Sequence, residues 1–218
     1  MAGSDIQHET LFEGFVMVNI YNMDCMEAMS TMETGKYDLA IVDPPYGIGM
    51  SCGAGKTRGG TMADLYIPKN WDIKPSPQYF HELRRVSKHQ IIWGGNYFAD
   101  LLPASRGWIY WEKMMGGNYA DGELAYTSFD RNIKQYTRRS ESGGRVHPCQ
   151  KPVSLYTWIL SNYAKPGWKI LDTHLGSGSS AIAAHDMGFH FDGYELDVDY
   201  YNAAKERLSH HERQLKLF

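Results

Sequence analysis

The segment ILDTHLGSGSS, residues 170–180, decides the predicted fold. It begins as an apolar strand, and Gly176 and Gly178 then permit a sharp bend and a close backbone approach to a ligand. Ser179 can cap a following helix. A second strand ends at Glu195, about twenty residues beyond Gly176, which is the usual spacing of an acid that binds ribose hydroxyls. The segment therefore predicts a strand, a ligand-binding glycine turn and a helix.

Apolar runs alternate with helix-like stretches along the rest of the chain, which favours a mostly parallel sheet covered by helices. The predicted strands are Phe15–Tyr21, Asp38–Val42, Gln90–Trp93, Trp108–Trp111, Glu123–Thr127, Lys169–Leu171 and Phe191–Tyr194. The predicted helices are Cys25–Thr31, Pro77–Val86, Val153–Tyr163, Ser179–Met187 and Asp199–His211. We predict one α/β domain over residues 1–218, with loops at 47–60 and 130–146.

Composition narrows the class of protein. The 218 residues suit one domain, and no run of apolar residues is long enough for a membrane span. The polar start of the chain does not resemble a secretory signal. Cys25, Cys52 and Cys149 are widely scattered, so we expect neither a disulfide framework nor a metal pair, and a cytoplasmic location. The net charge of −3 argues mildly against a nucleic-acid partner, although phosphate contacts need only one basic face.

The strand that ends at Val42 runs directly into Asp43-Pro44-Pro45-Tyr46. Two prolines end the strand, stiffen the turn and provide no N–H donor, so their carbonyls and the Asp43 carboxylate remain as acceptors. Such acceptors can hold the two N–H groups of a base amine and stabilise charge as the nitrogen is alkylated. Tyr46 can stack on an extruded base. The structural alternative is a stiff turn with a packing tyrosine.

Other short motifs are less specific. Gly55-Lys56-Thr57 resembles the end of a phosphate-binding loop, but Met50 stands where that motif requires glycine. In HPCQKP, residues 147–152, Pro152 suits a helix start, and no second ligand pair supports a metal site. Basic residues in the two predicted loops are candidates for DNA contacts: Lys56, Arg58, Arg131, Lys134, Arg138 and Arg139.

Taken together and in this order, the motifs resemble the amino-methyltransferases of DNA in their beta arrangement. In that family the catalytic turn comes first, a recognition segment follows, and the cofactor glycine turn is last. The resemblance implies the class I methyltransferase fold, a Rossmann-like seven-stranded sheet with a reversed last strand, helices on both faces and a permuted motif order. It implies S-adenosyl-L-methionine as the cofactor, no metal, and double-stranded DNA as the partner.

The resemblance also assigns residues. It implies catalytic roles for Asp43, Pro44, Pro45 and Tyr46. Trp93, Tyr97 or Phe98, after the third predicted strand, are candidates for a further wall of the base pocket, although aromatic residues beside a strand more often pack in the core. The resemblance implies cofactor contacts for Asp24, Cys25, Asp43, Gln150, Lys151, Asp172, Leu175, Gly176, Ser177, Gly178 and Glu195. The chain departs from the family at Thr173-His174, where Pro-Phe is frequent, so the aromatic cover on the cofactor is absent or replaced. The recognition segment, near residues 130–146, is short.

The predicted function is site-specific methylation of adenine N6 in DNA, because an Asp begins the catalytic turn where cytosine enzymes usually have Ser. Cytosine N4 is the near alternative. With Ala181 the glycine turn also fits a dinucleotide fingerprint, which leaves a dinucleotide-dependent oxidoreductase open. A non-catalytic DNA-binding relative, or an RNA or protein substrate, is a further alternative. The resemblance suggests a homodimer, acting in the cytoplasm of a bacterium or of a phage's host, in a restriction-modification setting.

Overall fold

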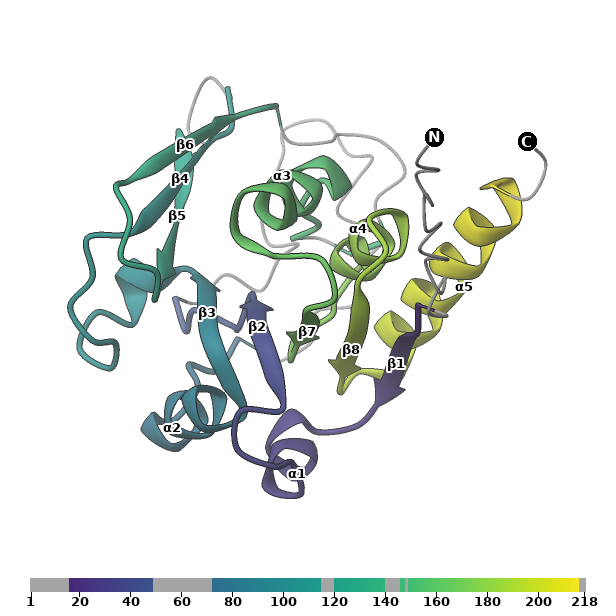
Figure 1. The fold of residues 1–218 in the computed structure, drawn as a ribbon, viewed down its shortest axis with the longest axis horizontal. Coiled ribbons are helices and arrows are strands. Elements are labelled where there is room, and N and C mark those ends of the chain that lie inside the picture. Colours follow the sequence, from purple (N-terminus) through teal and green to yellow (C-terminus); the bar gives the residue numbers. More distant parts are fainter. Residues whose placement is uncertain (1–15, 49–71, 115–119, 140–145, 148, 216–218) are drawn as a thin grey trace, which may run out of the picture.

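The computed structural model describes residues 16–48, 72–114, 120–139, 146–147 and 149–215. These residues form one sheet of eight strands in the order β1-β8-β7-β2-β3-β5-β4-β6 (Figure 1). The strands are β1 (Val18–Asn22), β2 (Tyr37–Val42), β3 (Ser87–Trp93), β4 (Trp108–Glu112), β5 (Gly122–Thr127), β6 (Lys134–Thr137), β7 (Lys169–Asp172) and β8 (His190–Glu195).

The directions of the strands agree with the predicted α/β class, which has a mostly parallel sheet. Only β5 runs against its neighbours, β3 and β4, and every other pair in this sheet is parallel. The reversed strand therefore lies inside the sheet, because β4 continues it and β6 forms the edge. The predicted α/β class is confirmed, while the expected number of strands was one too few.

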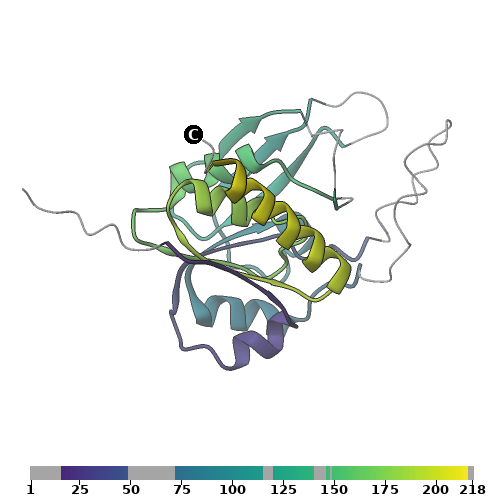
Figure 2. The ribbon, with the colours of Figure 1, turned by 90° about the vertical axis from the view of Figure 1, so that its right-hand side faces the viewer.

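Helices cover both faces of the sheet, as predicted (Figures 1 and 2). The helices α1 (Cys25–Ser30) and α2 (Pro77–Val86) lie on one face. The helices α3 (Val153–Tyr163), α4 (Ser179–Asp186) and α5 (Val198–Leu215) lie on the other. A short 3-10 turn, η2 (Gly95–Tyr97), follows β3.

The central strand β2 is apolar from Leu39 to Val42 because this stretch is buried on both faces. In β2, Leu39 and Ile41 belong to the cluster under α3 and α4, whereas Ala40 and Val42 belong to the cluster with α1 and α2. This alternation follows from the period of two of a strand. The carboxyl end of β2 is thus anchored on both sides, and the turn that follows it has a fixed starting point.

The predicted loop at 130–146 contains β6, which the sequence analysis missed. Its four residues, KQYT, alternate between part-buried and exposed side chains. Tyr136 packs against Trp158, with ring centroids 5.3 Å apart, and donates a hydrogen bond to Ser154 Oγ at 3.1 Å. A short edge strand among polar residues has too little periodicity to be identified without its partner β4.

Side-chain contacts connect α4 to α5. His211 Nε2 lies 2.6 Å from Asp186 Oδ1, and His185 Nδ1 lies 3.3 Å from the same oxygen. Within the described ranges this is the single group of potential metal-binding residues whose ligand atoms come within 4.8 Å of one another.

Two further features concern location and redox state. Among the described helices, none has the length and hydrophobicity of a membrane span. Cys25 is a free thiol, and Cys149 is disulfide-bonded. Cys52 lies outside the described residues.

Candidate active site

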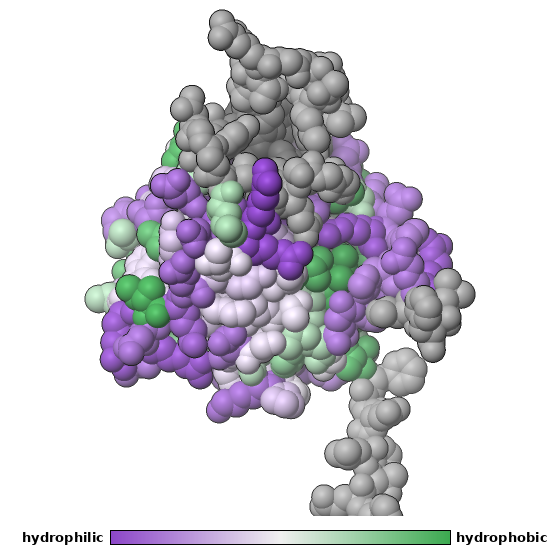
Figure 3. All heavy atoms as spheres, turned by 90° about the horizontal axis from the view of Figure 1, so that it is seen from above, coloured by the Kyte–Doolittle hydropathy of each residue, from purple (hydrophilic) through white to green (hydrophobic). Residues whose placement is uncertain are grey.

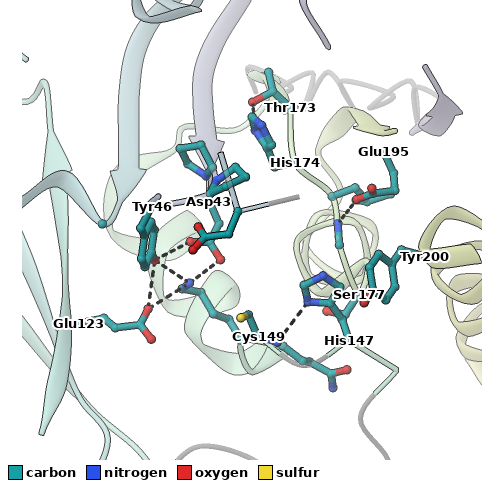
Figure 4. A pocket seen from close by; sticks show the side chains of 18 of the residues that line it. Asp43, Tyr46, Glu123, His147, Cys149, Thr173, His174, Ser177, Glu195 and Tyr200 are labelled. Atoms are coloured by element: carbon teal, nitrogen blue, oxygen red, sulfur yellow. Dashed lines mark hydrogen bonds and ion pairs between the residues drawn. The ribbon is translucent and has the colours of Figure 1, made fainter. Parts of the chain in front are cut away.

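The turn Asp43–Tyr46 directly follows β2, beside β7 and β3 in the sheet. The carboxyl ends of these parallel strands meet at one edge, which is where open α/β sheets bind ligands. Tyr46 Oη donates a hydrogen bond to Asp43 Oδ1 at 2.7 Å, so the turn closes on itself (Figure 4). Proline at positions 44 and 45 and this hydrogen bond together restrict how the Asp43 carboxylate can move.

The ring of Tyr46 lies against the backbone of the turn that follows β3. Gly94 has a φ of +67°, and a Cβ at this position would lie 2.2 Å from Tyr46 Cε1. Tyr97 stacks on the Tyr46 ring at 5.0 Å between centroids. Of the three predicted wall residues, Tyr97 is 40% exposed, whereas Trp93 and Phe98 are fully buried in the core. Tyr97 is therefore the one that an incoming base can reach.

A compact group of charges surrounds Asp43. Lys151 Nζ lies 2.5 Å from Asp43 Oδ2 and 3.1 Å from Glu123 Oε2, and Lys113 bonds the other Glu123 oxygen. Burial alone would raise the pKa of Glu123, but the charges of Lys151 and Lys113 hold this pKa at about 2. Burial alone would lower the pKa of Lys151, but Asp43 and Glu123 raise it above its ordinary value. Glu123 and Lys151 are therefore both charged near neutral pH.

The glycine turn between β7 and α4 is held by backbone hydrogen bonds. The Gly176 N–H donates to Glu195 Oε2 at 2.8 Å, and the Asp197 N–H donates to Glu195 Oε1 at 2.9 Å. Gly176 has a φ of +53°, in the left-handed region that favours glycine. This arrangement places Glu195 beside the glycine turn, as its spacing predicted.

Two predicted cofactor contacts lie behind the turn instead of in the cavity. Asp172 is buried and accepts hydrogen bonds from the His174 N–H at 3.0 Å and from Ser180 Oγ at 2.6 Å. Gly178 has a φ of +74°, and a Cβ at this position would lie 3.2 Å from Ala204 Cβ on α5. Neither residue lines the cavity described next. In this structure Asp172 shapes the turn and Gly178 allows α4 to pack against α5.

One cavity of about 1200 Å³ connects the two turns. At one end it is lined by Asp43, Pro44, Pro45, Tyr46, Tyr97 and Glu123. At the other end it is lined by Asp24, Cys25, Gln150, Leu175, Gly176, Ser177 and Glu195. The volume slightly exceeds the usual range for a single small-molecule site, about 300–1,000 Å³, so it can hold two ligands side by side. The structure thus brings most of the predicted site residues into one space.

The cofactor end combines the predicted residue Asp24 with His147 and His174, to which the sequence analysis gave no cofactor role. Asp24 caps α1 by accepting the Met26 and Glu27 N–H groups at its Oδ1, at 2.8 and 3.0 Å. His147 lies over Gly176, and its ring centroid is 4.4 Å from that of Tyr200 on α5 (Figure 4). His174 occupies the position where Phe is frequent in the family, and its Nδ1 lies 2.9 Å from Thr173 Oγ1.

Three of these side chains are uncharged at neutral pH. Burial lowers the pKa of His174 to about 4. Burial and the nearby Lys151 charge lower the pKa of His147 to about 4. Burial, together with Asp24, raises the pKa of the Cys25 thiol to about 12. Flat, neutral imidazoles can therefore replace an aromatic cover in this pocket.

The predicted DNA contacts separate into three groups. Arg131 is held against the protein: its Nη1 donates to the Asn162 carbonyl at 2.6 Å, and its guanidinium lies over the rings of Phe129 and Tyr163. Lys134 lies on β6, and Arg138 and Arg139 follow this strand as exposed residues. Lys56 and Arg58 lie outside the described residues.

The sequence analysis missed Glu123 and Lys113 as site residues, and it assigned Lys151 to the cofactor. Glu123 was visible only as the polar start of a predicted strand, and Lys113 as a lysine after another. Their positions along the chain carried one clue: Glu123 lies in β5, and Lys113 directly follows β4, which is the neighbour of β5 in the sheet. The distance between them in space, however, depends on the reversed strand β5, which the sequence pattern does not place.

Comparisons with known proteins point to one family. The profile of the N6/N4 DNA methylase family matches residues 110–206. YubD, a candidate methylase of Escherichia coli (strain K12), is 24% identical over 88% of this chain and 91% of its own length. The type II methyltransferase M.HindIII of Haemophilus influenzae is 36% identical over 69% of this chain, but the match spans only 42% of that enzyme.

Solved structures share the fold. The M1.HpyAVI–SAM complex superposes with a TM-score of 0.63 at 21% identity, over 88% of this chain and 100% of that one. The cytosine-N4-specific PvuII DNA methyltransferase superposes with a TM-score of 0.59 at 12% identity, over 90% and 91%. The predicted resemblance and fold are confirmed: this chain is similar to the N6/N4 amino-methyltransferases of DNA over residues 110–206, and it shares the fold of solved DNA methyltransferases.

Proposed function

We propose that this protein transfers a methyl group from S-adenosyl-L-methionine to the N6 amino group of adenine in double-stranded DNA. The observation that carries the proposal is the single cavity that joins the Asp43–Tyr46 turn to the glycine turn at Gly176. An oxidoreductase would need a reactive group for hydride chemistry beside the glycine turn. The neighbouring end of this cavity instead offers rigid acceptors and an aromatic ring.

The cofactor end fits S-adenosyl-L-methionine by the chemistry of its side chains. Glu195 and Asp24 carry carboxylates that suit the ribose hydroxyls and the α-amino group. Gln150 is buried, and its Oε1 accepts the Val146 N–H at 3.1 Å, which leaves its amide N–H groups for a carboxylate. His174 and Cys25 provide neutral, weakly polar walls for a purine. When bound, the cofactor supplies an electrophilic methyl group on a sulfonium.

The chain's own residues then act on the base. Tyr46, backed by Tyr97 and Gly94, provides a flat surface on which an extruded base can stack. Asp43 and the Pro44 carbonyl accept the two N–H groups of the amine and stabilise the positive charge that develops on its nitrogen. These groups are fixed before the base arrives, so little reorganisation is needed during the reaction. No covalent enzyme intermediate is required.

The choice of adenine over cytosine rests on Asp43, because an acid at the first position of the turn is similar to adenine enzymes. The test is direct. The protein is incubated with labelled S-adenosyl-L-methionine and polymerase-amplified DNA, which carries no methylation, and the DNA is digested to nucleosides. Label in N6-methyldeoxyadenosine supports the proposal, whereas label in N4-methyldeoxycytidine supports the cytosine alternative. Label in neither nucleoside rejects DNA amino-methylation.

The recognition segment, the assembly and the biological setting extend this proposal. We propose that residues 130–146 contact the DNA target, that 1–218 act as one methyltransferase domain, and that the enzyme serves a restriction-modification system in a bacterial or phage-infected cytoplasm.

The described part of the face in Figure 3 shows scattered hydrophobic residues and no broad apolar patch. Light scattering on the purified protein tests the proposed homodimer, and a monomer with full activity would reject it.

A further inference from the structure

Lys151 reaches the catalytic turn, although the resemblance assigned it to the cofactor. The residue stands just before Pro152, the N-cap of α3, and its side chain is only 4% exposed. Its Nζ donates to Asp43 Oδ2 at 2.5 Å and lies 3.5 Å from Tyr46 Oη (Figure 4). The ammonium also lies over the buried ring of Trp93, 5.1 Å from its centroid. Each of these contacts of the ammonium group is therefore with the catalytic end of the cavity.

Glu123 holds this lysine from the other side. Glu123 Oε2 lies 3.1 Å from Lys151 Nζ, and Oε1 is bonded by Lys113. Two carboxylates and two ammonium groups thus alternate as Asp43, Lys151, Glu123 and Lys113, with no net charge. A buried lysine without such partners would tend to lose its proton, whereas here both carboxylates favour the charged form.

The arrangement leaves the Asp43 carboxylate fixed but still able to accept. Tyr46 Oη donates to Oδ1, and Lys151 donates to Oδ2. Each carboxylate oxygen can accept more than one hydrogen bond, so an amine can still bind to a carboxylate whose orientation is already set. Removing either donor would free the carboxylate to rotate.

We propose that Lys151 is the positioning residue of this site, which orients the Asp43 carboxylate toward the substrate amine and places a positive charge beside it, and that Glu123 keeps Lys151 in place. The proposal deepens the proposed methyl transfer and rests on it. Lys151 contacts Asp43 and not the reacting atoms, so its effect on the reaction passes through Asp43.

Other titratable groups around Asp43 and Lys151 are neutral or distant from the pair. Tyr46 beside Asp43 and Tyr156 on α3 are phenols whose pKa values burial raises well above the ordinary value. His147 is neutral because burial lowers its pKa to about 4. Asp172, behind the glycine turn, is the remaining acid that acts on Asp43 through space.

The test uses two variants that change the charge beside Asp43 in opposite directions. Lys151→Met removes the positive charge, which makes Asp43 easier to protonate, so the acid limb of the pH–rate profile should move up by about one pH unit. Glu123→Gln keeps the shape and removes a negative charge, so the acid limb should move down. Single-turnover methyl transfer to amplified DNA is measured from pH 5 to 9. If Lys151 and Glu123 had only a structural role, the two variants would react more slowly, but the acid limbs of their pH–rate profiles would not move apart.

A binding readout separates this role from cofactor binding. Calorimetry with S-adenosylhomocysteine should give affinities within about threefold of the unchanged protein for both variants, while Lys151→Met loses at least about 10²-fold in rate at pH 7. A tenfold or greater loss of affinity with an unmoved acid limb would overturn the proposal and return Lys151 to the cofactor site.

A stability readout does not depend on the reaction. Urea unfolding of Lys151→Met, Asp43→Asn and the double variant should show that the two changes are not additive, because the two side chains are partners. Additive effects would reject the pairing itself. If the unchanged protein methylates no DNA, the proposed function fails, and the non-additivity still decides whether Lys151 positions Asp43. If Lys151→Met does not fold, the direction in which Glu123→Gln moves the acid limb of the pH–rate profile decides whether the proposal holds.

Discussion

The two ends of the cavity are built differently. The glycine turn is held mainly by hydrogen bonds of its own backbone groups and of Asp172, most of them between residues close in sequence. Tyr194, Glu195 and Arg207 add bonds from farther along the chain. The catalytic turn is held by side chains from distant segments, with Gly94 beneath Tyr46, Lys151 on Asp43, and Glu123 and Lys113 beyond. A motif can therefore describe the first end well, whereas for the second it names the reacting group without its support. The expected consequence is that substitutions at the two ends separate cofactor binding from turnover.

The largest effect is expected at Asp43. Asp43→Ala should lose at least about 10²–10³-fold in single-turnover methyl transfer, because a preorganised polar contact made in the transition state is lost. Affinity for S-adenosylhomocysteine should change little, since the glycine turn is intact. Asp43→Asn keeps one acceptor oxygen and should retain more activity than Asp43→Ala. Near-normal transfer by a folded Asp43→Ala protein would contradict the assignment of the catalytic end.

The second prediction concerns the support beneath Tyr46. In Gly94→Ala the new Cβ would meet the Tyr46 ring at 2.2 Å, so the ring must move. We expect methyl transfer to fall by about 10²-fold, because displacement by about 1 Å can cost that much, with normal binding of S-adenosylhomocysteine. Gly167→Ala is the matched control: its φ is +81° and nothing lies within 4 Å of its Cβ position. Both variants should lose melting temperature, and equal activity in the two would remove Gly94 from the site.

The third prediction sharpens the role of Asp172 at the glycine turn. Burial raises the pKa of Asp172 to about 7 from an ordinary 3.8. A raised carboxyl pKa means that the folded state binds more protons between these values, so the free energy of unfolding falls as pH rises from about 4 to about 7. Asp172→Asn keeps an acceptor for the His174 N–H and removes the charge. Its melting temperature relative to the unchanged protein should rise between pH 4 and pH 8 and then level off.

One result of the melting experiment would contradict the prediction for Asp172. A melting difference that stays constant across this pH range would show that Asp172 is not buried as an acid in the folded protein. Binding of S-adenosylhomocysteine, measured in parallel, should stay within a few-fold, because Asp172 does not line the cavity.

The smallest effect is expected on the DNA side. Arg138→Ala with Arg139→Ala should reduce the slope of DNA affinity against salt concentration by roughly one for each lost phosphate contact. Arg131→Ala provides the contrast, because Arg131 is bonded to the Asn162 carbonyl and should affect melting and not the slope. DNA binding is measured by fluorescence anisotropy from low to high salt. A changed slope for Arg131→Ala alone would reverse the assignment of the two groups.

The sequence by itself determined the α/β class, both turns and the family to which their order belongs. It could do so because each of these features depends on neighbours in the chain: an apolar run that ends at Asp43, two prolines, and glycines at fixed spacing from Glu195. Five helices were also placed to within a few residues, since a buried helix face repeats along its own sequence.

Only the tertiary structure decided what surrounds Asp43 and where the edge of the sheet lies. The reversed strand β5 brings Glu123 next to Lys151, and no local sequence pattern records a contact between two residues so far apart along the chain. The strand β6 forms only because β4 offers an open edge. For the same reason Asp172 and Gly178, which share a motif with Gly176, face away from the cavity: spacing fixes which residues lie in a turn, and packing against α4 and α5 fixes which way they point.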